Sequence, residues 1–84
     1  LAYGQTYRIE GTVIDKIKCK PLEFVNVLVV GLGIGSSTDA EGHFSVEQVP
    51  PGNLPFAGFH VGVQTVFTSE YRVNHRTPHI QIEM

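Results

Sequence analysis

The chain is short and carries few charges. Its 84 residues, with a mass of 9.2 kDa, are enough for one small domain. Apolar residues make up 42% and charged residues 17%, a balance that excludes a disordered chain, and the longest apolar run is too short for a membrane-spanning helix. Six basic against eight acidic residues give a net charge of −2, which argues against a nucleic-acid footprint and against an anionic-membrane patch.

The residue choice favours strands over helices. Val, Ile, Thr, Phe and Tyr together supply 31 of the 84 residues. Such β-branched and aromatic side chains fit a pleated, half-buried surface and are poorer helix formers. Nine Gly and five Pro provide turns between the apolar segments. The composition therefore predicts an all-β chain.

The first third of the chain predicts two strands joined by a basic loop. Residues 6–15 alternate between apolar and polar side chains, which is typical of a strand with one buried face. Its expected inner face consists of Tyr7, Ile9, Gly11 and Val13. The loop, residues 15–21, ends at Pro21, which interrupts strand pairing. Residues 24–30 are apolar on both faces apart from Asn26, so we expect a central strand covered on two sides.

The middle of the chain predicts a hairpin. The Gly- and Ser-rich residues 31–38 lead into a tight turn at 39–42, which Asp39 opens with its side-chain oxygen and Gly42 closes with a positive φ. Residues 43–49 alternate again, and Phe44 is expected to fill the core. We expect the segments on either side of this turn to pair with each other.

The second half contributes further strands at residues 54–61, 64–68 and 79–84. A turn at 50–53 precedes them, Gly62 marks a bend, and Pro55 indicates an edge position or a bulge. Residues 69–78 are polar and predicted irregular, whereas Ile80 and its second neighbour Ile82 point inward in the last strand. Six or seven short strands at this spacing indicate a sandwich or a barrel.

The N-terminal residues carry a hint about export. Residues 1–5 resemble the end of a signal peptide, with small residues at the two positions that a signal peptidase inspects. Cleavage would follow Gly4 and leave Gln5 as the first residue. These residues are otherwise an arbitrary end of the chain, and both interpretations stay open.

Two candidate binding features are better explained as loops. Cys19 is the single cysteine, so the chain has no internal disulfide, and neighbouring lysines could make its thiol more reactive. An incidental loop residue is the favoured interpretation. The glycine-rich residues 31–35 follow a strand but lack the helix and the lysine of a phosphate-binding loop, so a flexible connection is expected.

The polar residue types do not assemble into a catalytic or metal pattern. The histidines are His43, His60, His75 and His79; only the last two share a helical spacing, and Pro78 lies between them. Asp39 and Glu41 are too few for calcium and are assigned to the turn. Serines 36, 37, 45 and 69 have no histidine–carboxylate arrangement that the sequence supports. We predict a non-catalytic β-sandwich without catalytic, cofactor-binding or metal residues.

Several short motifs nevertheless follow a recognisable order. They are Gly11–Asp15, Pro21–Val27, Gly31, Thr38–Ser45, Val49–Leu54 and Val61–Gly62. In this order they resemble the carboxypeptidase regulatory-like domain, the CarboxypepD_reg-like group, from about Tyr7 to Met84. The chain departs from the family pattern at Val63, where an aromatic residue is usual, and at Pro55.

The resemblance implies a fold and a cellular setting. The fold is a transthyretin-like, or prealbumin-like, seven-stranded Greek-key sandwich formed by residues 6–84. Such domains are similar to the N-terminal extensions of TonB-dependent, SusC-like outer-membrane receptors in Bacteroidetes. That likeness implies an exported domain on the periplasmic side of the outer membrane.

The same resemblance implies an accessory role without enzyme activity. The implied partner is a protein, either the plug or barrel of its own receptor or a periplasmic protein. No cofactor and no nucleic acid are implied, and membrane contact is expected only through the rest of the parent chain. The alternative is a regulatory or folding module on a secreted carboxypeptidase or another exported enzyme.

Overall fold

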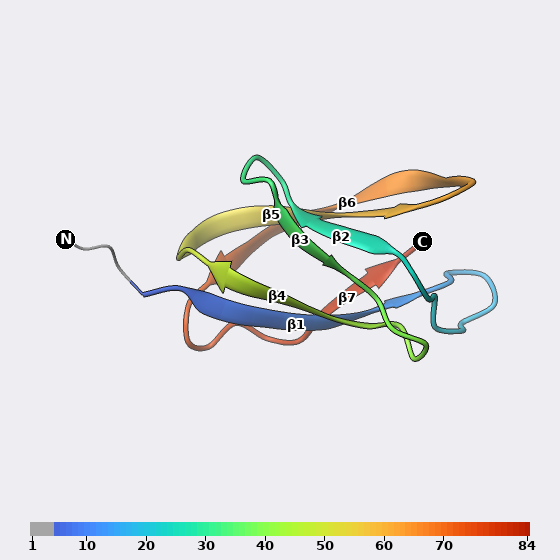
Figure 1. The fold of residues 1–84 in the computed structure, drawn as a ribbon, viewed down its shortest axis with the longest axis horizontal. Helices are drawn as coiled ribbons and strands as arrows, with labels where there is room; N and C mark the ends of the chain where they lie inside the picture. Colours follow the sequence, from blue (N-terminus) through green and yellow to red (C-terminus); the bar gives the residue numbers. More distant parts are fainter. Residues whose placement is uncertain (1–4) are drawn as a thin grey trace.

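The computed structural model describes residues 5–84, which form seven strands in two facing sheets (Figure 1). The strands are β1 (Tyr7–Ile14), β2 (Asn26–Val29), β3 (Ile34–Ser37), β4 (His43–Val49), β5 (Gly52–His60), β6 (Val63–Val73) and β7 (Ile80–Glu83). No helix in this part of the chain is long and apolar enough to cross a membrane. The signal-peptide remnant expected up to Gly4 lies outside the described residues.

The two sheets divide the strands in the orders β4-β1-β7 and β3-β2-β5-β6. β1 is antiparallel to β4 and parallel to β7, whereas every pairing in the second sheet is antiparallel. The chain changes sheet after β1, β3, β4 and β6. The predicted all-β, seven-stranded Greek-key sandwich is therefore confirmed.

The core lies between the inner faces of the two sheets. Its buried residues are Ile9, Val13, Val25, Val27, Val29, Phe44, Val46, Val49, Phe56, Val73, Ile80 and Ile82. The inward positions predicted for β1 and β7 are confirmed, because alternate side chains of a strand point to one face. The ring of Phe56 meets Tyr71 edge-on, with 6.1 Å between the ring centroids.

Phe44 packs against the backbone of β1 at Gly11. Phe44 lies directly opposite Gly11 in the β1–β4 ladder. A Cβ atom on Gly11 would collide with the Phe44 ring and with the Ile80 carbonyl oxygen of β7. The absence of a side chain at position 11 therefore lets an aromatic ring sit on β1.

The predicted hairpin at residues 31–49 is wrong, although its turn is correct. The Asp39 Oδ1 atom accepts the backbone N–H groups of Glu41 and His43, each at 2.9 Å, and Gly42 has φ +77°. The strands on either side of this turn lie in different sheets, because β3 pairs with β2 and β4 pairs with β1. Local turn chemistry is the same whether the two arms pair or cross between sheets.

Two other expectations also need correction. β2 is central in its sheet but only one of its faces is covered, since Asn26 and Leu28 are exposed. β6 continues through residues 69–73, which were predicted irregular, because they pair with β5 as far as Gly52. The polar residues at 69–72 form a strand because their backbone pairs with β5, although their composition favours an irregular segment. The bulge predicted at Pro55 is confirmed by a shift of register after that residue.

Phe44 provides a test of the core. Replacing it with alanine should lower the free energy of unfolding by about 3–5 kcal/mol, because a buried ring is lost and a cavity remains. Phe67→Ala is the matched control, since the Phe67 ring is mostly exposed, and should cost far less. Urea titration measures both, and equal midpoints for the two variants would contradict the assigned packing.

Gly42 and Gly62 separate backbone strain from close packing. Both have positive φ, +77° and +79°, but a Cβ on Gly42 would lie 2.6 Å from the Val13 oxygen, whereas nothing is near Gly62. Gly62→Ala should therefore cost about 1 kcal/mol from conformation alone. Gly42→Ala should cost clearly more in the same urea assay, and an equal or smaller cost would show that the turn does not pack against β1.

Candidate functional site

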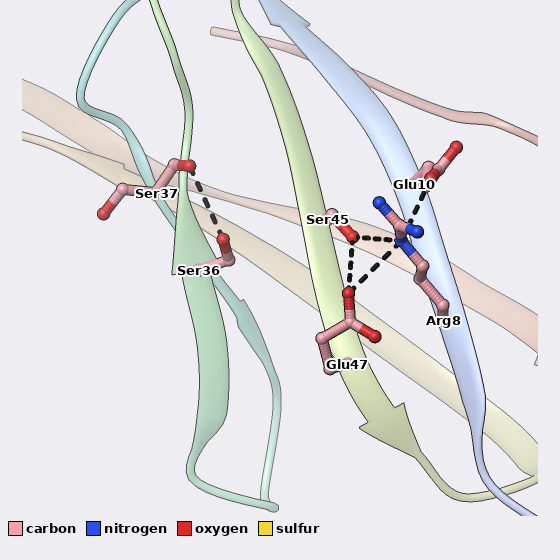
Figure 2. A network of polar contacts seen from close by, with 6 residues as sticks. All are labelled: Arg8, Glu10, Ser36, Ser37, Ser45 and Glu47. Atoms are coloured by element: carbon pink, nitrogen blue, oxygen red, sulfur yellow. Dashed lines mark hydrogen bonds and ion pairs between the residues drawn. The ribbon is translucent and has the colours of Figure 1, made fainter.

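The outer face of the β4-β1-β7 sheet is polar and charged. Figure 2 shows Arg8 of β1 between Glu10 on its own strand and Ser45 and Glu47 on β4. Arg8 Nε lies 3.1 Å from Glu10, 3.2 Å from Glu47 and 2.8 Å from the Ser45 hydroxyl. All three charged side chains are more than half exposed, so each pair contributes at most about 1 kcal/mol. The network makes this face well solvated rather than reactive.

A groove of about 520 Å³ runs beside this network toward β3. It reaches Ser36 and Ser37 on β3, which Figure 2 shows close to each other, and also His43 and His79. The His79 Nε2 atom lies 2.8 Å from the Thr12 hydroxyl. Within residues 5–84, no serine hydrogen-bonds to a histidine, so the Thr12–His79 pair is the contact between a hydroxyl and an imidazole that borders the groove.

The β3–β4 turn carries the one group of potential cation ligands among the described residues. Ligand atoms of Asp39, Glu41 and His43 lie within 4.8 Å of one another, all on exposed side chains. Sequence reasoning missed His43, although the alternating spacing of 39, 41 and 43 was a usable signal. One oxygen of Asp39 already accepts two backbone N–H groups, which agrees with the predicted role in the turn.

The remaining sequence candidates are dispersed. The glycine-rich residues 31–35 were predicted as a connection, but the connection between β2 and β3 ends at Gly33, and Ile34 and Gly35 belong to β3. Gly31 and Gly33 have positive φ. Cys19 is exposed in the β1–β2 loop and has no disulfide. His60 lies at the end of β5 and His75 in the β6–β7 connection, away from the turn at residue 39.

The lysine-bearing loop between β1 and β2 is held by Asp15. Its carboxylate accepts the backbone N–H groups of Lys18 at 2.8 Å and Ile17 at 2.9 Å. These two hydrogen bonds, that from Lys18 first, stabilise the charged form and lower the pKa of Asp15 below its ordinary value of 3.8. The loop is also closed by a hydrogen bond from Asp15 N–H to the Lys20 carbonyl oxygen, at 2.7 Å.

Part of the outer face of the other sheet is apolar and has no charged side chain around its hollow, whereas Glu70 and Arg72 lie further along β6. We call this apolar part the apolar sheet face; its exposed apolar residues are Leu28 and Val30 with Phe59, Val63 and Phe67. A hollow of about 360 Å³ lies between Leu28, Phe59 and Phe67, with Ala57 and Thr65 also lining it. Sequence reasoning missed this face because it assigned both faces of the central strand to the interior. The signal was residues 48–69, which contain no Asp, Glu, Lys or Arg.

These features define a small β-sandwich with a charged, solvated outer face on one sheet and an apolar patch on the outer face of the other. The family model of the CarboxypepD_reg-like domain matches residues 9–84. The chain therefore belongs to the CarboxypepD_reg-like domain family. No curated protein matches it.

Solved structures support the fold. A chain of a type II cohesin–X-dockerin complex from Acetivibrio cellulolyticus, a C-terminal interface mutant, is similar with a TM-score of 0.70 and 15% identity over 90% of this chain. A 9R-lipoxygenase from Cyanothece PCC8801 is similar with a TM-score of 0.52 and 16% identity over 94% of this chain. The present chain corresponds to only 51% and 16% of those two chains.

Proposed function

We propose that this chain is a non-catalytic interaction domain that docks a protein partner on its apolar sheet face. The observation that carries the proposal is the exposure of Leu28, Phe59 and Phe67 around a hollow whose lining contains no charged side chain. Monomeric proteins rarely leave a contiguous apolar patch open unless it serves an interaction.

The geometry of the face suits a protein surface. Strands of a packed sheet hold Phe59 and Phe67 in place, so little conformational entropy is lost on docking. The hollow between them accepts an apolar side chain of the partner, and aromatic anchors around such a hollow dominate binding energy.

We further propose that the parent is a TonB-dependent outer-membrane receptor for nutrient uptake, with this domain on the periplasmic side. Membership of the CarboxypepD_reg-like family supports this parent. The partner is then the plug or barrel of the same receptor, or a periplasmic protein. The second candidate is a regulatory or folding module of an exported enzyme such as a carboxypeptidase.

Cell fractionation tests the parent. An antibody against this domain should detect, in the outer-membrane fraction, a polypeptide many times larger than the 9.2 kDa of the present chain. A large soluble exported polypeptide with peptidase activity would support the second candidate instead. A soluble band near 9.2 kDa would overturn the receptor assignment.

Site-specific photo-crosslinking tests the docking face. A photoreactive phenylalanine analogue at Phe67 should crosslink to the receptor's own plug or barrel or to one periplasmic protein. The matched control places the analogue at Glu47, an exposed position on β4 in the opposite sheet that borders no hollow with Phe67, and should give no such product. The same products from both positions, or none from Phe67, would contradict the proposed face.

A further inference from the structure

The most exposed apolar side chains of the described residues lie on two loops at one end of the molecule. Ile17 is 88% exposed, Val61 84% and Phe24 71%, more than any other large apolar side chain within residues 5–84. Ile17 and Phe24 belong to the β1–β2 connection, and Val61 to the β5–β6 turn. Figure 1 shows both connections at the right-hand end of the long axis, near the C-terminus.

Local structure holds these side chains outward. The hydrogen bond from the Ile17 N–H to Asp15 shapes the tip of its loop, and Lys16 N–H donates to the Met84 carbonyl oxygen at 2.7 Å. Phe24 has φ +62°, a left-handed conformation that is costly for an aromatic residue. Its backbone N–H is bound to the Thr38 carbonyl oxygen at 3.1 Å. Phe24 has a strained backbone, and its ring is not buried in the core in compensation. This combination suggests that the ring contacts another molecule.

All three lysines of the chain lie on the same loop as Ile17. Lys16, Lys18 and Lys20 are exposed and surround that side chain in sequence. Acidic side chains outnumber the three lysines near this end: Asp15 lies in the lysine loop itself, Glu23 in the same connection, Asp39 and Glu41 in the β3–β4 turn, and Glu83 opposite Ile14 at the end of β7. Attraction to an anionic surface is therefore local to the lysine loop, and apolar insertion must supply much of the binding.

The shape of this end differs from that of the apolar sheet face. The sheet face has a hollow bordered by aromatic rings, whereas Ile17, Phe24 and Val61 line neither of the hollows described above. Convex apolar tips on separate loops would need a matching set of cavities on a protein partner. A fluid lipid interface adapts to such tips, and lysines beside them meet headgroup phosphates.

We propose that this end of the domain docks directly on a lipid surface with anionic headgroups, with Ile17, Phe24 and Val61 inserted and the lysine loop at the phosphates. The lipid contact goes beyond the protein-docking function of the sheet face and does not depend on the identity of the parent. The proposed lipid contact differs from the expectation that the net charge of −2 argues against an anionic-membrane patch, because net charge does not show that the three lysines lie on one loop.

The absence of tryptophan from the chain makes insertion directly measurable. In the Val61→Trp variant the indole emission should shift to the blue on vesicles of phosphatidylcholine with roughly a quarter phosphatidylglycerol. Leu32→Trp is the matched control, because Leu32 is also an exposed apolar turn residue, in the β2–β3 connection away from this end. Its emission should not change. An unchanged spectrum for Val61→Trp, or equal shifts for both variants, would overturn the proposal.

Co-sedimentation with the same vesicles tests the two components separately. Ile17→Ser combined with Val61→Ser should weaken binding by clearly more than tenfold, whereas Leu32→Ser should bind as the wild type does. Replacing Lys16, Lys18 and Lys20 with glutamine should weaken binding at least tenfold, since each lysine near an anionic surface contributes roughly fivefold. Circular dichroism checks that these surface variants stay folded.

The contrary results are equally clear. Equal binding of the wild type to vesicles with and without phosphatidylglycerol would overturn the role of the lysines. A wild-type chain that remains in the supernatant with every vesicle would overturn lipid docking altogether, and the tips would then be a candidate contact for a protein.

Discussion

The buried side chain of Thr38 organises the end of the molecule on which the proposed lipid contact depends. Its hydroxyl donates to the Leu22 carbonyl oxygen at 2.6 Å and accepts the Val25 N–H at 2.9 Å. Its backbone N–H donates to the Val25 carbonyl oxygen, also at 2.9 Å. The segment after β3 is thereby tied to the segment before β2. A buried hydroxyl with both partners satisfied is a strong local constraint, because loss of either partner would leave a polar group without water.

This constraint also explains why the chain crosses between sheets after β3. With Thr38 bonded to the β1–β2 connection, the turn at residue 39 continues onto β1, where the Val13 N–H donates to the Gly42 carbonyl oxygen at 2.8 Å. β4 then pairs with β1, and Phe44 meets Gly11. The hydrogen bonds that Thr38 forms with Leu22 and Val25 fix the backbone on both sides of Phe24 and so hold its ring outward. The fold and the exposure of that aromatic ring therefore have a common cause.

The sequence pattern could predict local features, such as the inner face of a strand or a tight turn. It could not predict which strands pair with each other. The inner faces of β1 and β7 follow from strict alternation at Ile9, Val13, Ile80 and Ile82, and the turn at Asp39 follows from side-chain oxygens near the backbone. The partner of β3 could not be predicted, since both pairings satisfy the same turn. The exposure of Leu28 could not be predicted either. An apolar residue is expected to be buried, but the sequence does not say whether this chain or another molecule buries it.

The two proposed contacts, the apolar sheet face and the exposed loop end, together explain why residues 48–69 carry no charge. The β5–β6 hairpin contributes Phe59, Val63 and Phe67 to the apolar sheet face and Val61 to the exposed end. A charged side chain at an outward position between Phe59 and Phe67 would have to lose its hydration on one of the two proposed contacts, at a cost that pairing rarely recovers, whereas Glu70 and Arg72 lie beyond this part of the hairpin. Because the tip and the sheet face lie on different sides of the hairpin, a domain seated on lipid through its loops keeps the sheet face open to a protein. Residues 48–69 can therefore take part in the protein contact and the lipid contact at the same time, because they bring no charged side chain to either.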